Sequence, residues 1–184
     1  MGKVIVTVVG PDRPGIIARV AGLLYRRQGN LENVSQTILQ SVFSGTFIVQ
    51  LPEDISPEEL ARELRDAVAP LDLKAYVDRY QAPAADSDPG KSDPYVITTR
   101  GPDQKGLVAR ITAILAAYRV NVTDLKAVFK GGDDPDDNIM IYEVDVPHTT
   151  DRRVLTSALK AKAAQLDLTI NIQHRRIFEA INRI

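Results

Sequence analysis

A six-residue motif occurs twice in the chain, and this repeat constrains the fold more than any other feature. Gly10-Pro11-Asp12-Arg13-Pro14-Gly15 recurs as Gly101-Pro102-Asp103-Gln104-Lys105-Gly106. Further matches follow in order through both halves, ending with Leu71-Asp72-Leu73 and Leu166-Asp167-Leu168. A chain of 184 residues has room for two small domains. We therefore predict two copies of one fold.

Each copy has the residue pattern of a β-α-β-β-α-β unit. Strands are expected at 3–9, 33–42, 46–51 and 74–79 in the first copy and at 95–100, 122–130, 138–146 and 169–173 in the second. Right-handed crossovers then give a four-stranded antiparallel sheet with both helices on one face. The fold class is therefore α+β, with two ferredoxin-like units. The hairpin connection of the first copy is predicted at 42–46, and the second copy carries its extra residues at 131–137.

The first helix of each copy shows one apolar stripe with helical spacing. The stripe residues are Ile16, Ile17, Val20, Leu23 and Leu24 in the first copy and Leu107, Val108, Ile111, Ile114 and Leu115 in the second. Gly29-Asn30 is expected to end the first of these helices, and Asn121 lies at the matching point after the other. Each helix is thus predicted to bury one side.

The second helix of the first copy has a clear start signal. Ser56 is the expected N-cap, Pro57 occupies the first helical position, and Glu59 follows three residues after the cap. In the second copy, Thr149 or Thr150 is the expected cap.

The repeat and the composition divide the chain into four segments. We predict domains at 1–80 and 94–174, a Pro- and Gly-containing linker at 81–93, and an amphipathic helix at 175–184. Apolar residues on this helix are Ile177, Phe178, Ile181 and Ile184. Because so short a helix is marginal alone, we expect it to dock on its own sheet or on a partner and to hold a homodimer together. We also expect the two sheets to pack edge to edge.

The composition excludes several kinds of site. The absence of cysteine rules out disulfides, thiolate metal sites and cysteine nucleophiles. Both histidines, His148 and His174, are expected at the surface, and no nucleophile–base pair or acid pair is evident. We therefore predict no catalytic activity, no cofactor and no metal site. The aspartates of 131–137 are expected to be solvated rather than to hold a cation.

Charge and hydropathy indicate a cytoplasmic protein. A net charge of −1 and an aromatic content of 5% argue against direct nucleic-acid binding. No apolar run reaches the ~20 residues of a membrane span. The N-terminal residues read as a strand from Lys3 onward, so no signal peptide is expected.

The repeated loop allows a structural and a functional interpretation. Asp12 and Asp103 can cap the following helix by accepting hydrogen bonds from backbone N–H groups. The same helix N-terminus offers N–H donors to a carboxylate ligand, and Gly15 and Gly106 allow close approach. The two interpretations are compatible.

These motifs resemble those of the ACT domain. The resemblance rests on Gly10–Ile17, Gly29–Asn33 and Gly45–Phe47 in the first copy and on Gly101–Val108 and Val120–Val122 in the second. A tandem of such domains without an enzyme domain is similar to regulators of the glycine cleavage repressor family. The resemblance implies a regulatory protein that binds an amino acid and signals to a transcription factor or a metabolic enzyme. A ligand-free dimerisation module is the remaining alternative.

We expect the amino acid to lie between the loop of one unit and the asparagine of another. In this topology the first helix starts and ends at opposite ends of the sheet, so a loop and its own asparagine cannot meet. The expected ligand-binding residues are Asp12, Arg13, Pro14, Gly15, Ile16, Asn30, Asp103, Gln104, Gly106, Leu107 and Asn121. Gln104-Lys105 replaces Arg13-Pro14 in the second copy, so the two loops are not expected to use ligand equally.

Overall fold

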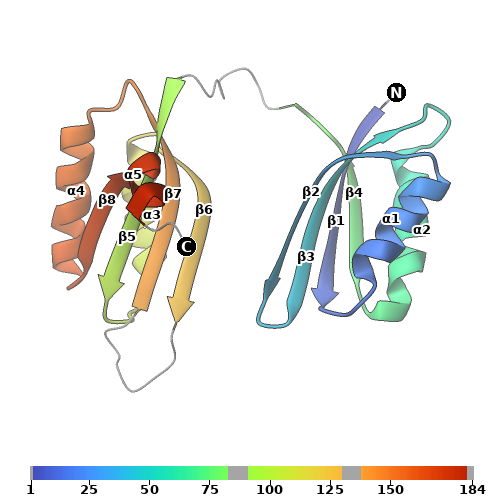
Figure 1. Ribbon diagram of the computed structural model, residues 1–184, viewed down its shortest axis with the longest axis horizontal. Helices are drawn as coiled ribbons and strands as arrows, with labels where there is room; N and C mark the ends of the chain where they lie inside the picture. The colour runs from blue at the N-terminus through green and yellow to red at the C-terminus, as the bar shows by residue number, and fades with distance from the viewer. Residues whose placement is uncertain (1, 83–90, 130–137, 182–184) are drawn as a thin grey trace. The chain divides into compact units, whose positions relative to one another are not determined.

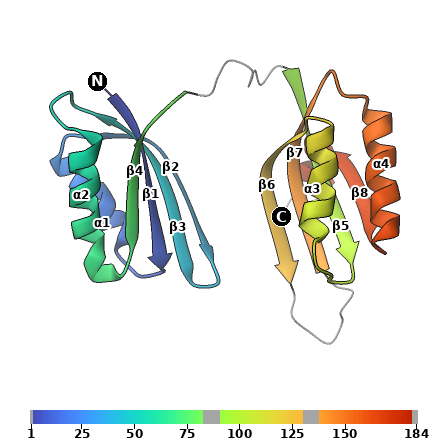
Figure 2. The ribbon, with the colours of Figure 1, turned by 180° about the vertical axis from the view of Figure 1, so that it is seen from behind.

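The computed structural model describes residues 2–82, 91–129 and 138–181. The chain forms two compact units, within residues 1–84 and 85–184 (Figures 1 and 2). The expectations for the aspartate loop at 131–137, for most of the linker and for Ile184 concern positions outside the described residues. The predicted packing of the two sheets and the domain limits stay predictions.

The first unit has the predicted β-α-β-β-α-β order. Its elements are β1 (Gly2–Pro11), α1 (Ile16–Arg26), β2 (Asn30–Leu39), β3 (Val42–Leu51), α2 (Pro57–Val68), the short 3-10 helix η1 (Ala69–Leu71) and β4 (Lys74–Arg79). The sheet order is β2-β3-β1-β4 and every pair is antiparallel. Both helices cover one face of the sheet (Figure 1). The predicted fold is therefore confirmed.

The core of the first unit follows the two periodicities of the sequence. Alternate residues of β1, namely Val4, Val6 and Val8, are fully buried beneath the helices. The side chains that share this core come from α1, from the neighbouring strand β3 and from α2, and they include Val20, Leu24, Phe47, Leu60 and Leu64. Within the predicted stripe of α1, Ile17 departs from the expectation because 37% of its surface is exposed.

The second unit repeats this architecture. Its elements are β5 (Ser92–Gly101), α3 (Leu107–Ala117), β6 (Asn121–Phe129), β7 (Asn138–Pro147), α4 (Arg152–Gln165), β8 (Thr169–His174) and α5 (Arg175–Ile181). The sheet order is β6-β7-β5-β8, again antiparallel throughout. Ile111, Leu115, Tyr142 and Leu159 are fully buried in its core.

The C-terminal helix α5 covers the sheet face opposite to α3. Tyr95 and Ile97 point into the core, so Val96 between them points to the other face, where it is only 2% exposed. Arg175, at the start of α5, forms an ion pair of 3.1 Å with Glu143 on β7. In Figure 1 α5 lies in front of the sheet and α3 behind it. Of the predicted stripe, Phe178 is half-buried, whereas Ile177 is 53% exposed.

Deleting residues 175–184 is therefore expected to lower the thermal stability of the second unit. The deletion uncovers Val96 and removes the partner of Glu143, a loss of about 1.5–3 kcal/mol for one buried side chain of this size. Differential scanning calorimetry measures the effect, with the exposed Ile177→Ala as the control that leaves the melting temperature nearly unchanged. Light scattering of the same samples tests the predicted homodimer. An unchanged melting temperature after deletion would show that α5 contributes nothing to the fold.

The hairpin of the first unit lies elsewhere than predicted. β2 and β3 are joined by Gln40 and Ser41, with φ of 46° and 67°, rather than by residues 42–46. Two consecutive positive φ angles are typical of the type I′ turn, whose twist matches the strands it joins. Gly45 suggested a turn in the sequence, but it lies inside β3, where a Cβ atom would come within 2.7 Å of the Phe43 ring.

The structure confirms one helix start and corrects another. Ser56 caps α2, and its hydroxyl accepts a hydrogen bond of 3.1 Å from the Glu59 N–H. α4 is capped by Asp151 rather than by Thr149 or Thr150. The Asp151 carboxylate accepts from the N–H groups of Arg153 and Val154, whereas the Thr150 hydroxyl donates to the Tyr118 carbonyl.

Strand and helix ends also shift by a few residues. β1 and β5 extend to Pro11 and Gly101, and β5 begins at Ser92, because proline and glycine at these ends are tolerated in the ladder. α1 ends at Arg26, and the left-handed residue after it is Gln28 rather than Gly29 or Asn30. Asn30 is already the first residue of β2.

Candidate functional site

The loop between β1 and α1 presents a helix N-terminus without a side-chain cap. Gly15 is the N-cap residue, with φ of 91° in the left-handed region, and no side chain bonds to the first turn. The first intrahelical bond runs from the Arg19 N–H to the Gly15 carbonyl, so the N–H groups before Arg19 have no helical acceptor. Asp12 is therefore not the cap that the structural interpretation expected. Its own N–H instead donates to the Ser41 carbonyl at 2.8 Å.

The loop residues of the first unit are accessible. Asp12, Arg13, Pro14 and Gly15 are all exposed, whereas the Ile16 side chain is buried in the core. Pro14 precedes the N-cap and thus lies outside the helix. The structure brings these five predicted residues together at one end of the sheet, and only the backbone of Ile16 can contact a ligand there.

The corresponding loop of the second unit has the same backbone but different side-chain contacts. Gly106 is the left-handed N-cap of α3, with φ of 86° and again no side-chain cap. The Gln104 carboxamide donates to the Leu166 carbonyl at 2.7 Å, so its amino group is already used by the protein. Asp103 is exposed and accepts a hydrogen bond of 3.4 Å from the Asn138 carboxamide. Leu107 is buried.

Asn138 is a polar residue that the sequence interpretation did not single out. It is 5% exposed, and its Oδ1 atom has no hydrogen-bond partner within the part of the chain that the structure describes. It pairs with Gly101, as Phe43 pairs with Gly10 in the first unit. The sequence contained one sign that Asn138 is unusual. An asparagine stands where the first unit has the buried Phe43, next to the insertion at 131–137.

The two predicted asparagines lie far from the loops of their own units. Asn30 and Asn121 are exposed and begin β2 and β6, where they pair with Gln50 and Asp145. The loop lies beyond the other end of β2, because Pro11 and Leu39 both pair with Val42. A strand of this length spans about 30 Å. As the sequence argument expected, Asp12 and Asn30 of one unit cannot bind the same small ligand.

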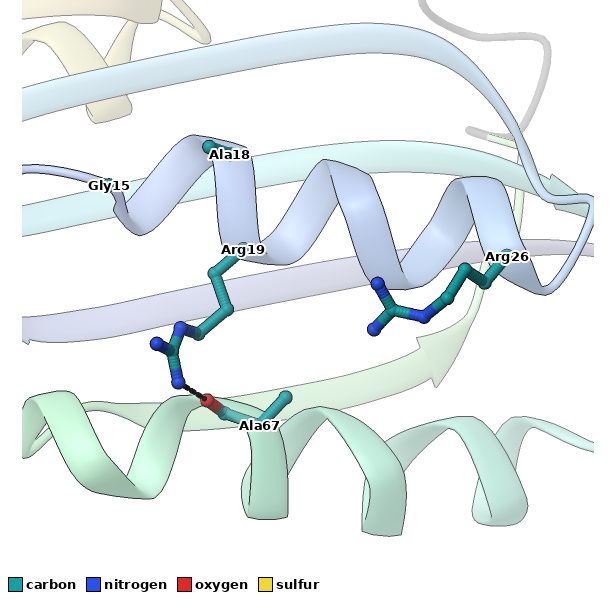
Figure 3. A pocket seen from close by; sticks show the side chains of 5 residues that line it. All are labelled: Gly15, Ala18, Arg19, Arg26 and Ala67. Atoms are coloured by element: carbon teal, nitrogen blue, oxygen red, sulfur yellow. Dashed lines mark hydrogen bonds between the residues drawn. The ribbon is translucent and has the colours of Figure 1, made fainter.

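A hollow of about 560 Å³ begins at the uncapped end of α1 and runs between α1 and α2. Gly15, Ala18, Arg19, Arg26 and Ala67 line it (Figure 3). The Arg19 guanidinium donates to the Ala67 carbonyl at 3.1 Å, and the Arg26 side chain extends into the same space. Neither arginine was predicted as a site residue. The hollow thus carries positive charge along α1, from Arg19 near the free N–H groups to Arg26 in the last helical turn.

In residues 2–82, 91–129 and 138–181 no three His, Asp or Glu side chains gather in a way that suits a metal ion. Over the same ranges, none of the helices combines the length and the apolar character needed to span a bilayer.

Comparison with known proteins gives matches to both units. Residues 4–69 and 93–173 each match a model of the ACT domain. A UPF0237 protein of Methanopyrus kandleri is 38% identical over 78 residues, which are 42% of this chain and 87% of that protein. A UPF0237 protein of Methanosarcina acetivorans is 31% identical over 94 residues, 50% of this chain and 98% of its own length.

Two solved structures match nearly the whole chain in fold. A protein of unknown function from Galdieria sulphuraria superposes with a TM-score of 0.76 at 20% identity, covering 94% of this chain and 98% of that one. A candidate glycine cleavage system transcriptional repressor superposes with a TM-score of 0.63 at 18% identity, covering 94% and 96%. At these identities the likeness concerns the fold alone.

Proposed function

The chain belongs to the ACT-domain family of regulatory small-molecule-binding domains, and from that premise we propose that it binds an amino acid and passes its bound state to a partner protein. The observation that carries the proposal is the uncapped helix N-terminus after each Gly-Pro-Asp loop. Backbone N–H groups without acceptors, at the positive end of a helix dipole, suit a carboxylate.

The surroundings of α1 favour an α-amino acid over a simple anion. Arg19 adds positive charge near the carboxylate, and the exposed Asp12 supplies a negative charge for the ammonium group. Asn30 from another ACT unit is the second proposed acceptor for that ammonium, because its own unit keeps it about 30 Å from the loop. A ligand held in this way changes how units associate, which is what a regulatory switch requires.

The second loop is proposed to bind more weakly or a different amino acid. Gln104 is tied to Leu166, and Asp103 is bonded to Asn138, so both side chains already have partners in the protein. Asp103, Gly106, the Leu107 N–H and Asn121 are the remaining proposed contacts there.

Asp12→Ala and Asn30→Ala are each expected to weaken amino-acid binding by about tenfold or more, the loss of one charge-assisted hydrogen bond. Titration calorimetry with the twenty amino acids, after a thermal-shift screen, measures the change. Asn33→Ala, on the same exposed strand as Asn30, is the matched control and keeps wild-type affinity. Equal affinity of wild type and both site variants would place the ligand elsewhere. No stabilisation by any amino acid would favour the dimerisation module.

The partner is proposed to act in transcriptional control of amino-acid metabolism, as the fold likeness to a candidate repressor suggests. Affinity capture with and without the amino acid tests this part. A captured transcription factor supports it. A captured metabolic enzyme would make the chain a regulatory subunit instead.

A further inference from the structure

A groove in the second unit lies between α4 and the edge strand β8, away from the Asp103 loop. It has a volume of about 670 Å³, and α4 and β8 run side by side in both views of the ribbon (Figures 1 and 2). Ile170 and Ile172 are half-buried and form an apolar floor. The wall contributed by α4 consists of polar side chains: Arg152, Arg153, Thr156, Ser157 and Lys160.

The strand that borders the groove has an unpaired edge. Within the described residues β8 pairs only with β5, so the N–H and C=O groups on its other side are not part of a sheet ladder. Such an edge is a template for an additional strand. An extended peptide on this edge would lie directly under the α4 wall.

The wall carries an unusual concentration of positive charge. Arg152 and Arg153 occupy the first turn of α4, and no acidic residue is present there. Cations at this position oppose the helix dipole, which favours acidic residues in the first turn. Departures from such local rules are expected where function requires them.

Part of this charge is available to a ligand. Arg152 is already paired with Asp93 at 3.3 Å and bonded to the Tyr95 hydroxyl at 2.9 Å. Across the portions of the chain that the structure describes, no ion pair is formed by the side chains of Arg153 and Lys160. These two cations lie two helical turns apart along the groove.

The first unit provides an internal comparison, because its α2 and β4 are the equivalents of α4 and β8. The α2 helix obeys the dipole rule, with Glu58 and Glu59 in its first turn. In the aligned repeat, Glu58 occupies the position of Arg153, and Arg65 that of Lys160. The uniform positive wall is thus a property of the second unit and not of the shared fold.

We propose that an acidic segment of a partner protein binds in this groove in extended conformation, adding to β8 as a fifth strand. Its carboxylates pair with Arg153 and Lys160, and its backbone bonds to the free edge of β8. A polypeptide is favoured over a nucleic acid because the floor is aliphatic and Tyr95, the one aromatic in the groove, already contacts His174 and Arg152. The inference does not depend on amino-acid binding.

A fluorescein-labelled decapeptide of alternating Glu and Thr is the probe, and fluorescence anisotropy with the full chain gives its affinity. Arg153→Glu/Lys160→Glu is expected to weaken binding by at least about tenfold, since both charge pairs become repulsive. Arg62→Glu/Arg65→Glu, on the equivalent helix of the first unit, is the matched control and leaves affinity unchanged. Circular dichroism melting checks the fold; both side chains are exposed, and glutamate at position 153 suits the start of α4.

Three further probes separate strand addition from other modes of binding. The same peptide with Gln for Glu should not bind. N-methylation of one alternate set of peptide amides should abolish binding and methylation of the other set should not, because only one set faces β8. A ten-residue thymidine oligonucleotide should bind more weakly than the acidic peptide.

Several results would overturn the proposal. These are the absence of peptide binding, equal binding by Arg153→Glu/Lys160→Glu, equal binding of both N-methylated peptides, and tighter binding of the oligonucleotide. A wild-type dimer that the Arg153→Glu/Lys160→Glu variant dissociates in light scattering, without peptide binding, would assign the groove to a second copy of the chain.

Discussion

Gly101→Ala is expected to lower the free energy of unfolding of the second unit by about 2–5 kcal/mol, from overpacking and backbone strain together. A Cβ atom at this position would lie 2.7 Å from the Asp167 carbonyl oxygen and 2.8 Å from Leu168 Cδ2. The backbone oxygen cannot move away without disturbing the start of β8. In addition φ is 158°, a conformation that residues with a side chain rarely adopt.

Urea unfolding followed by circular dichroism measures this loss. Gly106→Ala is the control, because its φ of 86° is also unfavourable but the nearest atom to a new Cβ is 3.8 Å away. It should cost only the backbone strain, about 1–2 kcal/mol. If both variants lose the same free energy of unfolding, the close approach of Gly101 to Asp167 does not contribute to the effect.

The same contact explains why two distant motifs recur together in the sequence. Gly10 would place a Cβ 2.8 Å from the Asp72 carbonyl oxygen, just as Gly101 does with Asp167. The first glycine of the loop motif therefore packs against the Leu-Asp-Leu motif in each unit. The sequence argument expected close approach at Gly15 and Gly106, which the structure shows to be left-handed helix caps; the approach of a ligand to them stays a prediction.

Alkaline pH is expected to destabilise the second unit through Tyr142. Burial raises the pKa of Tyr142 to about 12 from the ordinary value of 10.0. Because the unfolded chain loses this proton first, the contribution to stability is complete below pH 10 and is lost as the pH rises from 10 to 12. Two pKa units correspond to about 2–3 kcal/mol.

Unfolding in urea at a series of pH values between 8 and 12 tests this expectation. Tyr142→Phe should lose less free energy of unfolding between pH 8 and pH 12 than the wild type does. The loss that remains in both proteins comes from the exposed lysines and tyrosines. Phenylalanine is the residue at the equivalent position 47, and the Tyr142 hydroxyl donates only to the Met140 sulfur at 3.2 Å. The variant should therefore fold normally at pH 7. An identical alkaline loss in both proteins would contradict the assignment to Tyr142.

The sequence predicted the elements where one strong local signal decided the outcome. The Ser56-Pro57 start of α2 and the strand at 74–79 are correct to the residue. The predicted position of the hairpin was wrong because Gln40 and Ser41 have positive φ angles, which neither residue type favours. Gly45 is a residue type that favours turns, but it lies inside β3. Here the burial of the Phe43 ring in the core outweighs the local turn preference of Gly45.

The candidate site was predicted in part for a similar reason. The loop residues adjoin in sequence, so their proximity around α1 followed from the motif. Ala67 and Asn138 come near the loops only through the packing of helices and strands far away in the chain, whereas Arg26 lies at the other end of α1. The charged groove of the second unit likewise needs the adjacency of α4 and β8, which a linear pattern does not display.

The pairing of the first strand with the last in each unit has a consequence for how such a chain can be assembled. Val4 pairs with Arg79, and Tyr95 pairs with His174, so each unit starts and finishes at neighbouring points on one sheet end. A module with adjacent ends can be duplicated in tandem or spliced into another protein without opening its sheet. It also tolerates circular permutation, with new ends at an exposed hairpin tip such as Gln40–Ser41. The strand order, which places the two ends of each unit side by side, therefore makes each unit easy to duplicate or insert.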